Sequence, residues 1–160
     1  MPVADDDRLE AWAAFLRAHA LVTAKLSREL QAERGLPLTW YDVLLQLRLA
    51  GGKARMQELA RRVLLSKSGL TRLADRMEAS GLVERRSCPS DRRGTLVALT
   101  PAGRRALRAA VPVHVRGIHE HFIGRLDEQE LRALHGALTR VLDGGGAEPA
   151  GGPGEASGPG

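Results

Sequence analysis

The chain has 160 residues, of which 43% are hydrophobic, 27% charged and 3% aromatic, as expected for one globular domain with an aliphatic core. It has no run of about 18 apolar residues, the length of a membrane span, and its acidic start, Asp5–Asp7, is unlike a signal peptide. These features predict a cytoplasmic protein without membrane association, and the single cysteine, Cys88, excludes an intramolecular disulfide.

The formal net charge of +5 is concentrated in the middle of the chain. Residues 53–108 hold 14 of the 24 Lys and Arg residues but only 5 of the 19 Asp and Glu residues, so the flanking segments are acidic on balance. A basic centre between acidic flanks is typical of a polyanion-binding face. Charge alone is also compatible with a solvated, arginine-rich surface.

Apolar residues spaced three and four apart predict four helices before residue 80. Their expected ranges are 8–33, 40–50, 55–63 and 66–79. Thr39 and Ser66 stand at the N-cap positions of the second and fourth helices, and Gly81 follows the fourth. The third and fourth are short helices on a tight connection, which predicts a helix-turn-helix.

The periodicity changes after Gly81 and predicts a β-hairpin. Leu82–Ser87 and Thr95–Leu99 are short, partly β-branched runs, and the polar segment Cys88–Gly94 separates them. The expected fold is therefore mainly α with a small β-hairpin, in the order α-α-α-α-β-β-α-α.

Two helices are expected after the hairpin. Thr100 and Pro101 have the residue types of an N-cap and first helical position, and the helix they open should reach about Ile123. Asp127 and Glu130 resemble a capping pair for a last helix that ends near Leu142. Residues 143–160 are rich in Gly and Pro and predict a disordered tail.

The outer face of the predicted helix 66–79 is suited to reading DNA. Leu70, Leu73, Ala74 and Met77 share one face, so the remaining positions point away from the core. The candidates for DNA contact are Ser66, Lys67, Ser68, Thr71, Arg72 and Arg76. Hydroxyl groups can contact phosphates or bases, and arginine can bind guanine through two hydrogen bonds. A plain amphipathic helix with a solvated outer face is the alternative.

The hairpin loop carries two adjacent arginines, Arg92 and Arg93, beside Asp91. Arginine on a narrow projecting element suits the minor groove, where negative potential is concentrated. We expect Asp91 to orient an arginine, either Arg93 or Arg76, without touching DNA. An arginine pair directly after a helix-turn-helix favours a winged helix-turn-helix that binds double-stranded DNA over an ordinary polar hairpin.

With these motifs in place, the sequence resembles the MarR family of bacterial transcriptional regulators. The stretches that carry the resemblance are Leu38–Leu44, Leu59–Ala60, Ser66–Leu73, Arg76–Glu78, Gly81–Arg85, Asp91–Gly94 and Leu99–Gly103. The resemblance implies a single domain over residues 8–142, after a flexible N-terminus at 1–7. In that domain a winged lobe, 38–104, is combined with N- and C-terminal dimerisation helices at 8–33 and 101–142.

The resemblance further implies a homodimer that acts as a ligand-responsive repressor on a palindromic operator, with half-sites about one helical turn apart. It implies no enzymatic activity, and no motif of a catalytic site occurs in the sequence. The apolar stripes of the terminal helices agree with dimerisation, although such helices can also cap their own monomer. A basic helical module that binds RNA or protein without operator specificity is the alternative function.

The resemblance also implies a small aromatic or anionic effector, bound between the dimer helices and the DNA-binding lobe. Residues that could line such a pocket are Trp12, Phe15, His19, Trp40, Tyr41, Asp42 and Arg48; each could equally be a core or hinge residue. No cofactor and no metal are expected, because His114, His119 and His121 lack the spacing of a metal-binding pair. Cys88 is interpreted as incidental rather than as a redox sensor.

Overall fold

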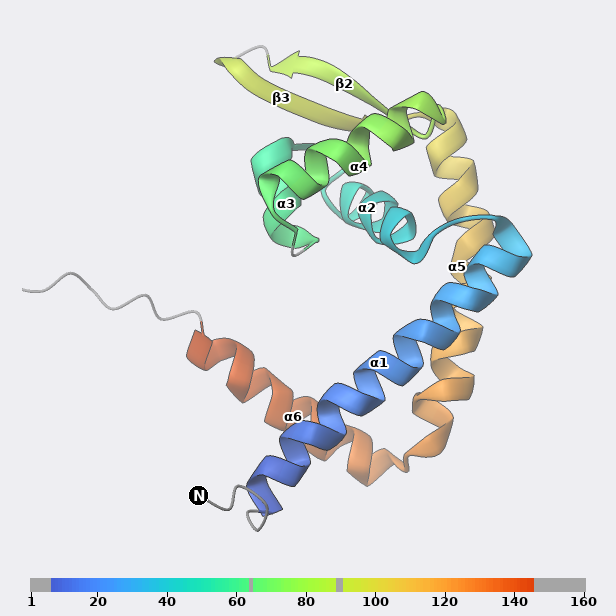
Figure 1. The fold of residues 1–160 in the computed structure, drawn as a ribbon, viewed down its shortest axis with the longest axis vertical. Helices are drawn as coiled ribbons and strands as arrows, with labels where there is room; N and C mark the ends of the chain where they lie inside the picture. The colour runs from blue at the N-terminus through green and yellow to red at the C-terminus, as the bar shows by residue number, and fades with distance from the viewer. Residues whose placement is uncertain (1–6, 64, 89–90, 146–160) are drawn as a thin grey trace, which may run out of the picture. The chain divides into compact units, whose positions relative to one another are not determined.

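We describe the protein from a computed structural model, which covers residues 7–63, 65–88 and 91–145. It is mainly helical with a three-stranded antiparallel sheet, as the sequence predicts for the fold class (Figure 1). The chain divides into two units, Met1–Phe122 and Ile123–Gly160, which are described in turn. None of the described helices combines the length and apolarity required to span a membrane.

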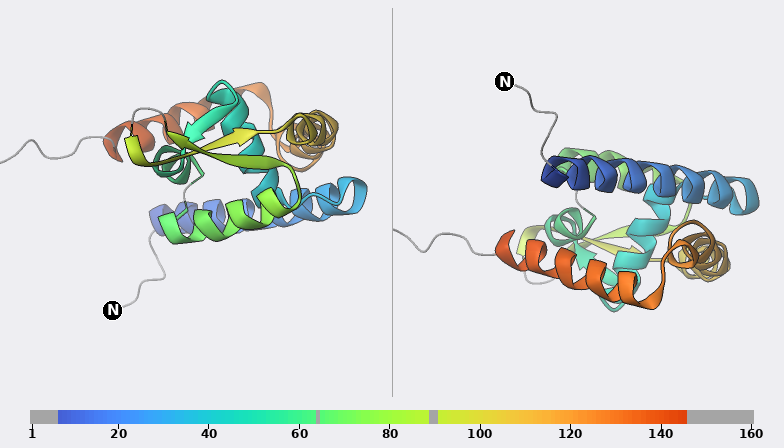
Figure 2. Two further views of the ribbon diagram at one scale, coloured as in Figure 1. Left: turned by 90° about the horizontal axis from the view of Figure 1, so that it is seen from above. Right: turned by 90° about the horizontal axis from the view of Figure 1, so that it is seen from below.

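The winged lobe of the first unit follows the expected helix-turn-helix and hairpin. It comprises α2 (Leu38–Leu49), β1 (Lys53–Arg55), α3 (Met56–Arg62), α4 (Lys67–Ala79), β2 (Val83–Cys88) and β3 (Asp91–Leu99). The strands lie in the order β1-β3-β2, and Val97 of β3 faces Ala54 on one side and Arg85 on the other. In the left view of Figure 2, where α5 (Pro101–His121) is seen end-on, the hairpin extends away from this helix.

Strand β1 was not expected, and the predicted element order is wrong at this point. Its three residues pair with β3, and Ala54 between two exposed neighbours is buried. Three residues carry too little alternation to be recognised in a sequence. β3 also begins earlier than predicted, at Asp91, so part of the expected loop is strand.

The core of the winged lobe lies between its helices and the sheet. Fully buried side chains come from every helix of the lobe, among them Leu44, Leu47, Leu59, Leu70 and Met77. The predicted inner face of α4 is confirmed, since its four apolar residues at spacings of three and four are all buried. Burial of this stripe fixes the opposite side of α4 as its outer face.

Helix caps decide where α4 and α5 begin. The Ser66 hydroxyl accepts a hydrogen bond from the Gly69 amide at 3.1 Å, which confirms the predicted N-cap. The Thr100 hydroxyl accepts from the Gly103 amide at 3.0 Å, again as predicted. The predicted cap of α2 is wrong, because α2 begins at Leu38 and Pro37 occupies the N-cap position. Thr39 therefore lies inside the first turn.

Helix α1 (Asp7–Arg34) packs on α5 only along its C-terminal half. Leu26 and Leu30 are buried there, and a Cβ atom on Gly117 of α5 would lie 2.6 Å from Leu26 Cδ2, so the two helices approach closely. An ion pair joins Glu33 to Arg116, and a hydrogen bond joins Glu29 Oε1 to His121 Nε2. The N-terminal half of α1 leaves its large apolar side chains exposed, namely Leu9, Trp12, Phe15, Leu16 and Leu21.

The second unit contains a 3-10 turn, Ile123–Arg125, and α6 (Glu128–Gly145). The predicted capping pair is confirmed: the Glu130 amide donates to Asp127 Oδ1, and the Asp127 amide donates to Glu130 Oε2, both at 2.8 Å. α6 continues three residues beyond the predicted end at Leu142, into the segment expected to be disordered. Val141 and Leu142 are exposed on it.

Candidate nucleic-acid interface

The outer face of α4 presents cations to solvent. Lys67, Arg72 and Arg76 are exposed, and Arg72 borders both of the shallow hollows found along this helix. Arg72 and Arg76 lie on the side of α4 opposite the buried stripe, and Lys67 lies at its flank in the first turn. Exposed lysine and arginine side chains can reach phosphates or base edges of a nucleic acid.

The hydroxyl groups predicted to contact DNA are partly engaged within the helix. Ser66 caps α4 and lies 3.3 Å from the Ser68 hydroxyl. The Thr71 hydroxyl donates to the Lys67 carbonyl at 2.8 Å. Thr71 can therefore offer an incoming group only its lone pairs, whereas Lys67 and Arg72 offer donors.

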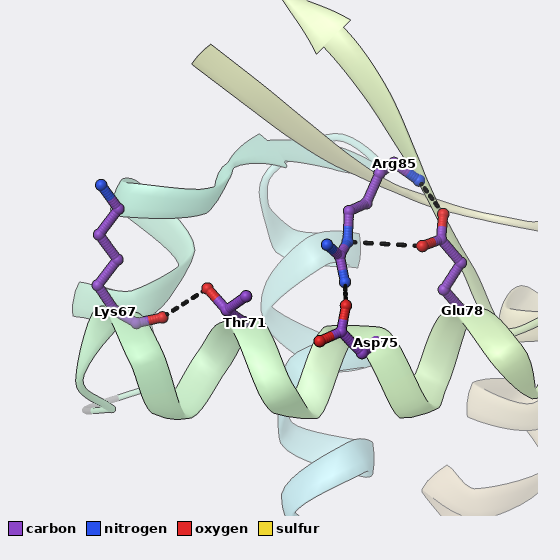
Figure 3. A network of polar contacts seen from close by, with 5 residues as sticks. All are labelled: Lys67, Thr71, Asp75, Glu78 and Arg85. Atoms are coloured by element: carbon purple, nitrogen blue, oxygen red, sulfur yellow. Dashed lines mark hydrogen bonds and ion pairs between the residues drawn. The ribbon is translucent and has the colours of Figure 1, made fainter. Parts of the chain in front are cut away.

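Figure 3 shows a contact between α4 and the hairpin that the sequence analysis missed. The Arg85 guanidinium of β2 pairs with Asp75 and lies 3.5 Å from Glu78 Oε2, and the Arg85 amide donates to Glu78 Oε1 at 2.8 Å. Arg85 is the more buried partner, at 26% side-chain exposure. We call this set, Asp75, Glu78 and Arg85, the clamp. It ties β2 to the C-terminal half of α4 and neutralises two acids on that helix.

The sequence holds a signal for the clamp, though a weak one. Asp75 and Glu78 are three residues apart on α4, so they share a side of the helix. Recognising Arg85 as their partner requires knowing how β2 crosses the helix, which spacing alone does not give.

The tip of the hairpin carries the predicted wing residues. The backbone of Asp91, Arg92 and Arg93 belongs to β3, and Cys88 faces Asp91 across the hairpin. Their side chains, like Pro89 and Ser90 as a whole, lie outside the described part of the structure. The expected roles of Asp91, Arg92 and Arg93 and the interpretation of Cys88 thus stay predictions.

A cleft of about 470 Å³ lies among α1, α2 and α5. It is lined by His19, Thr23, Leu26, Leu38, Thr39, Tyr41, Asp42, Leu45 and His114. Three of the seven predicted pocket residues are among them: His19, Tyr41 and Asp42.

The other four predicted pocket residues lie elsewhere. Trp12 and Phe15 stack on each other along exposed α1, at a centroid distance of 6.0 Å. Trp40 packs against the lobe's core, and Arg48 is exposed near the end of α2. His114 was considered above only as a metal ligand, for which its spacing is unsuitable. In the structure the centroid of its ring lies 4.4 Å from that of the Tyr41 ring.

Burial shifts the titration of three groups at this cleft. It raises the pKa of Asp42, against smaller lowering effects of a Gln46 hydrogen bond and nearby His114. It lowers the pKa of His114, opposed by the charge of Asp42. Burial and then the charge of Asp42 raise the pKa of Tyr41. In each of the three groups, burial favours the neutral form more than water does.

The histidines of α5 do not form a cluster. His114 contacts Tyr41, His121 pairs with Glu29, and His119 is exposed. Among the residues that the structure describes, no group of three or more His, Cys, Asp or Glu side chains could hold a metal ion.

Comparison with known proteins gives one consistent result. The sequence profile of the MarR family matches residues 34–94. The multiple antibiotic resistance protein MarR of Salmonella typhimurium is 31% identical over 104 residues, which cover 65% of this chain and 72% of that protein. The similar proteins are transcriptional regulators, which agrees with the expectation that this chain is not an enzyme.

Two solved structures from Streptomyces coelicolor are also similar. AbsC, a MarR family transcriptional regulator, is 36% identical, with a TM-score of 0.81 over 87% of this chain and 94% of that one. Sco3205, a MarR family regulator solved in complex with DNA, is 30% identical, with a TM-score of 0.82 over 94% of this chain and 95% of that one.

Proposed function

The chain belongs to the MarR family of DNA-binding transcriptional regulators, and we propose that this member is an effector-responsive repressor that binds a palindromic operator as a homodimer. The observation that carries the proposal is the outer face of α4, where Lys67, Arg72 and Arg76 are exposed beside a hairpin fixed to the same helix by the clamp.

In this proposal the N-terminal half of α4 enters the major groove. Lys67 and Arg72 read base edges, with arginine suited to guanine. Thr71, whose hydroxyl hydrogen is occupied, accepts from an amino group of adenine or cytosine. Ser66 and Ser68 lie at the helix N-terminus, where the amides favour a phosphate, and Arg76 contacts the backbone farther along.

The hairpin tip would occupy the adjacent minor groove through Arg92 and Arg93, with Asp91 orienting an arginine. The similarity to Sco3205, which was solved with DNA, supports this assignment. The clamp also supports this assignment, because it attaches the hairpin to α4 and so keeps the two elements at a constant distance.

Dimerisation through α1, α5 and α6 is supported by exposed apolar side chains. Trp12 is 59% exposed and Leu21 likewise 59% on α1, and Val141 and Leu142 are exposed on α6. Monomeric proteins rarely leave so many large apolar groups in water. A two-fold dimer presents two copies of α4, which matches a palindromic operator.

The cleft beside Tyr41 and Asp42 is the proposed effector site. It lies on α2, an element that also contributes Leu44 and Leu47 to the core of the winged lobe. A ligand there touches the lobe without competing for the outer face of α4.

The test is a gel-shift titration of the full chain against duplex DNA from upstream of its own gene, random duplex DNA and duplex RNA, each at two salt concentrations. We expect tight binding to one DNA segment that weakens steeply with salt, because phosphate contacts release counterions. Equal affinity for random DNA, or preference for RNA, contradicts the proposal and favours a nonspecific basic module.

A further inference from the structure

The cleft among α1, α2 and α5 carries a single formal charge on its walls. Asp42 is the one acid among the described residues that line it, and this set contains no Lys or Arg. An adjoining hollow of about 550 Å³, between α1 and the start of α2, has neither acids nor Lys or Arg among its described lining residues. The charge that this space presents to a ligand is therefore negative.

Two side chains at the cleft, Thr23 and Asp42, have unused hydrogen-bond acceptor sites. The Thr23 hydroxyl already donates to the His19 carbonyl at 2.7 Å, so it presents lone pairs. Asp42 has acceptor sites beyond the one that Gln46 uses. A bound molecule that donates hydrogen bonds can pair with these acceptor sites.

The remaining wall is apolar and aromatic. Leu26, Leu38 and Leu45 line it beside the ring of Tyr41. The volume of about 470 Å³ suits a compound with one or two rings, since small-molecule sites span roughly 300–1,000 Å³.

We propose that this cleft binds a flat aromatic cation with N–H donors, of the amidine or amine class, in preference to an aromatic carboxylate. The N–H groups bind the Asp42 carboxylate by charge-assisted hydrogen bonds, and the ring packs between the leucines and Tyr41. A carboxylate in the same place meets Asp42 with no Lys or Arg on the wall to offset the repulsion.

This inference rests on the proposed function, in which the cleft is the effector site. Of the aromatic or anionic effector implied by the family resemblance, it keeps the aromatic ring and replaces the anionic group with a cationic one. Binding also changes the environment of Asp42, because a cation at its side favours the ionised carboxylate that burial disfavours.

Three isosteric probes test the charge preference: benzamidine, a cation at neutral pH; benzamide, which is uncharged; and benzoate, an anion. Isothermal titration calorimetry on the full chain at pH 7 should give the affinity order benzamidine, benzamide, benzoate, with about tenfold or more between the first and the last. Asp42→Asn should weaken benzamidine about tenfold and leave benzamide within about twofold.

Two further variants serve as controls for the effect of Asp42→Asn. Asp42→Glu keeps the charge and should retain the order even if Asp42→Asn folds poorly, which circular dichroism would reveal. Asp143→Asn removes an exposed carboxylate on α6 and should change nothing. The proposal is overturned if benzoate binds as tightly as benzamidine, if the order survives in Asp42→Asn, or if none of the probes binds.

The proposed function is tested separately by operator binding without ligand. If benzoate binds best and releases the operator, the ligand class is wrong and the effector-responsive repressor stands. If no operator is selected but the affinity order appears, the cleft assignment holds and the regulatory proposal fails.

Discussion

The clamp of Asp75, Glu78 and Arg85 allows a direct test of how the hairpin is held against α4. Arg85→Gln removes the guanidinium and leaves two carboxylates on the helix. The stability cost is modest because Asp75 and Glu78 are 58% and 42% exposed, and such ion pairs contribute about 0.2–1 kcal/mol each. We expect the free energy of unfolding to fall by about 1 kcal/mol, and Tm by about 2–4 °C.

The expected loss in DNA affinity is larger than the loss in stability. A carboxylate about 8 Å from a phosphate is repelled by about 0.5 kcal/mol in water. Arg85→Gln changes the net charge by one, which at this distance costs about 0.5 kcal/mol. Releasing the hairpin from α4 adds an ordering cost of about 1 kcal/mol, the stability that the clamp contributes, so the sum is about 1.5 kcal/mol. Kd for an operator duplex should therefore rise about tenfold, as measured by fluorescence anisotropy at low salt. The effect should shrink as salt screens the charges.

Arg86→Gln is the matched control, since it removes the same charge from the next residue of β2, where Arg86 pairs with Glu84. Arg86→Gln should raise Kd by about threefold or less. Adding Asp75→Asn to Arg85→Gln should lower Kd again by about twofold, because one carboxylate that repels the DNA is removed. The reasoning is refuted if the control costs as much as Arg85→Gln, or if the second substitution restores nothing.

The remaining predictions concern the DNA contacts, the packing of α5 and pH. Arg72→Ala should relax base preference at one position per half-site by about 1–3 kcal/mol, measured by competition with single-base variants. Arg93→Ala should weaken all sequences alike and reduce the salt slope by about 1 for each wing. A Cβ atom on Gly103 would overlap the Leu82 carbonyl oxygen, so Gly103→Ala should cost about 3 kcal/mol and lower Tm by about 5–10 °C in a thermal melt. An unchanged Tm contradicts this packing. Burial lowers the pKa of His114 below its ordinary 6.5, so the stability that neutral His114 contributes is present above pH 6.5 and is lost as pH falls through the folded pKa. His114→Gln should therefore reduce the pH dependence of the free energy of unfolding, measured in urea, between about pH 7 and 5. An unchanged pH dependence contradicts this prediction.

Most of the fold was predictable because it depends on local signals. The buried stripe of α4 repeats at helical spacing, and the caps at Ser66 and Thr100 use side chains next to the amides they bind. Strand β1 has no such local signal, since the residues with which it pairs lie more than 40 positions later, in β3. The cap of α2 was placed wrongly because Thr39 has the preferred residue type, while Pro37 sets the start of the helix.

The candidate sites were predictable only in part, for a related reason. The cations of α4 follow from the helix face, because whatever opposes a buried stripe is exposed. The clamp and the position of His114 depend instead on which elements meet in space. Arg85 meets α4 from β2, and His114 meets Tyr41 from α5, and neither pairing leaves a trace in residue spacing.

The contacts along α5 indicate where a ligand in the cleft could act on the winged lobe. Near its start, Gly103 lies against the Leu82 carbonyl, which ties this end to the lobe; farther on, Gly117 lies against Leu26, which ties that part to α1. The cleft residue His114 lies between these two close contacts, two residues after Pro112. Proline cannot donate the amide hydrogen bond of a regular helix, so α5 is least resistant to bending there. If the cleft is the effector site, as proposed, we expect a ligand that separates α2 from α1 to change the angle between the lobe and α1 through Pro112 and to leave the clamp and the outer face of α4 intact.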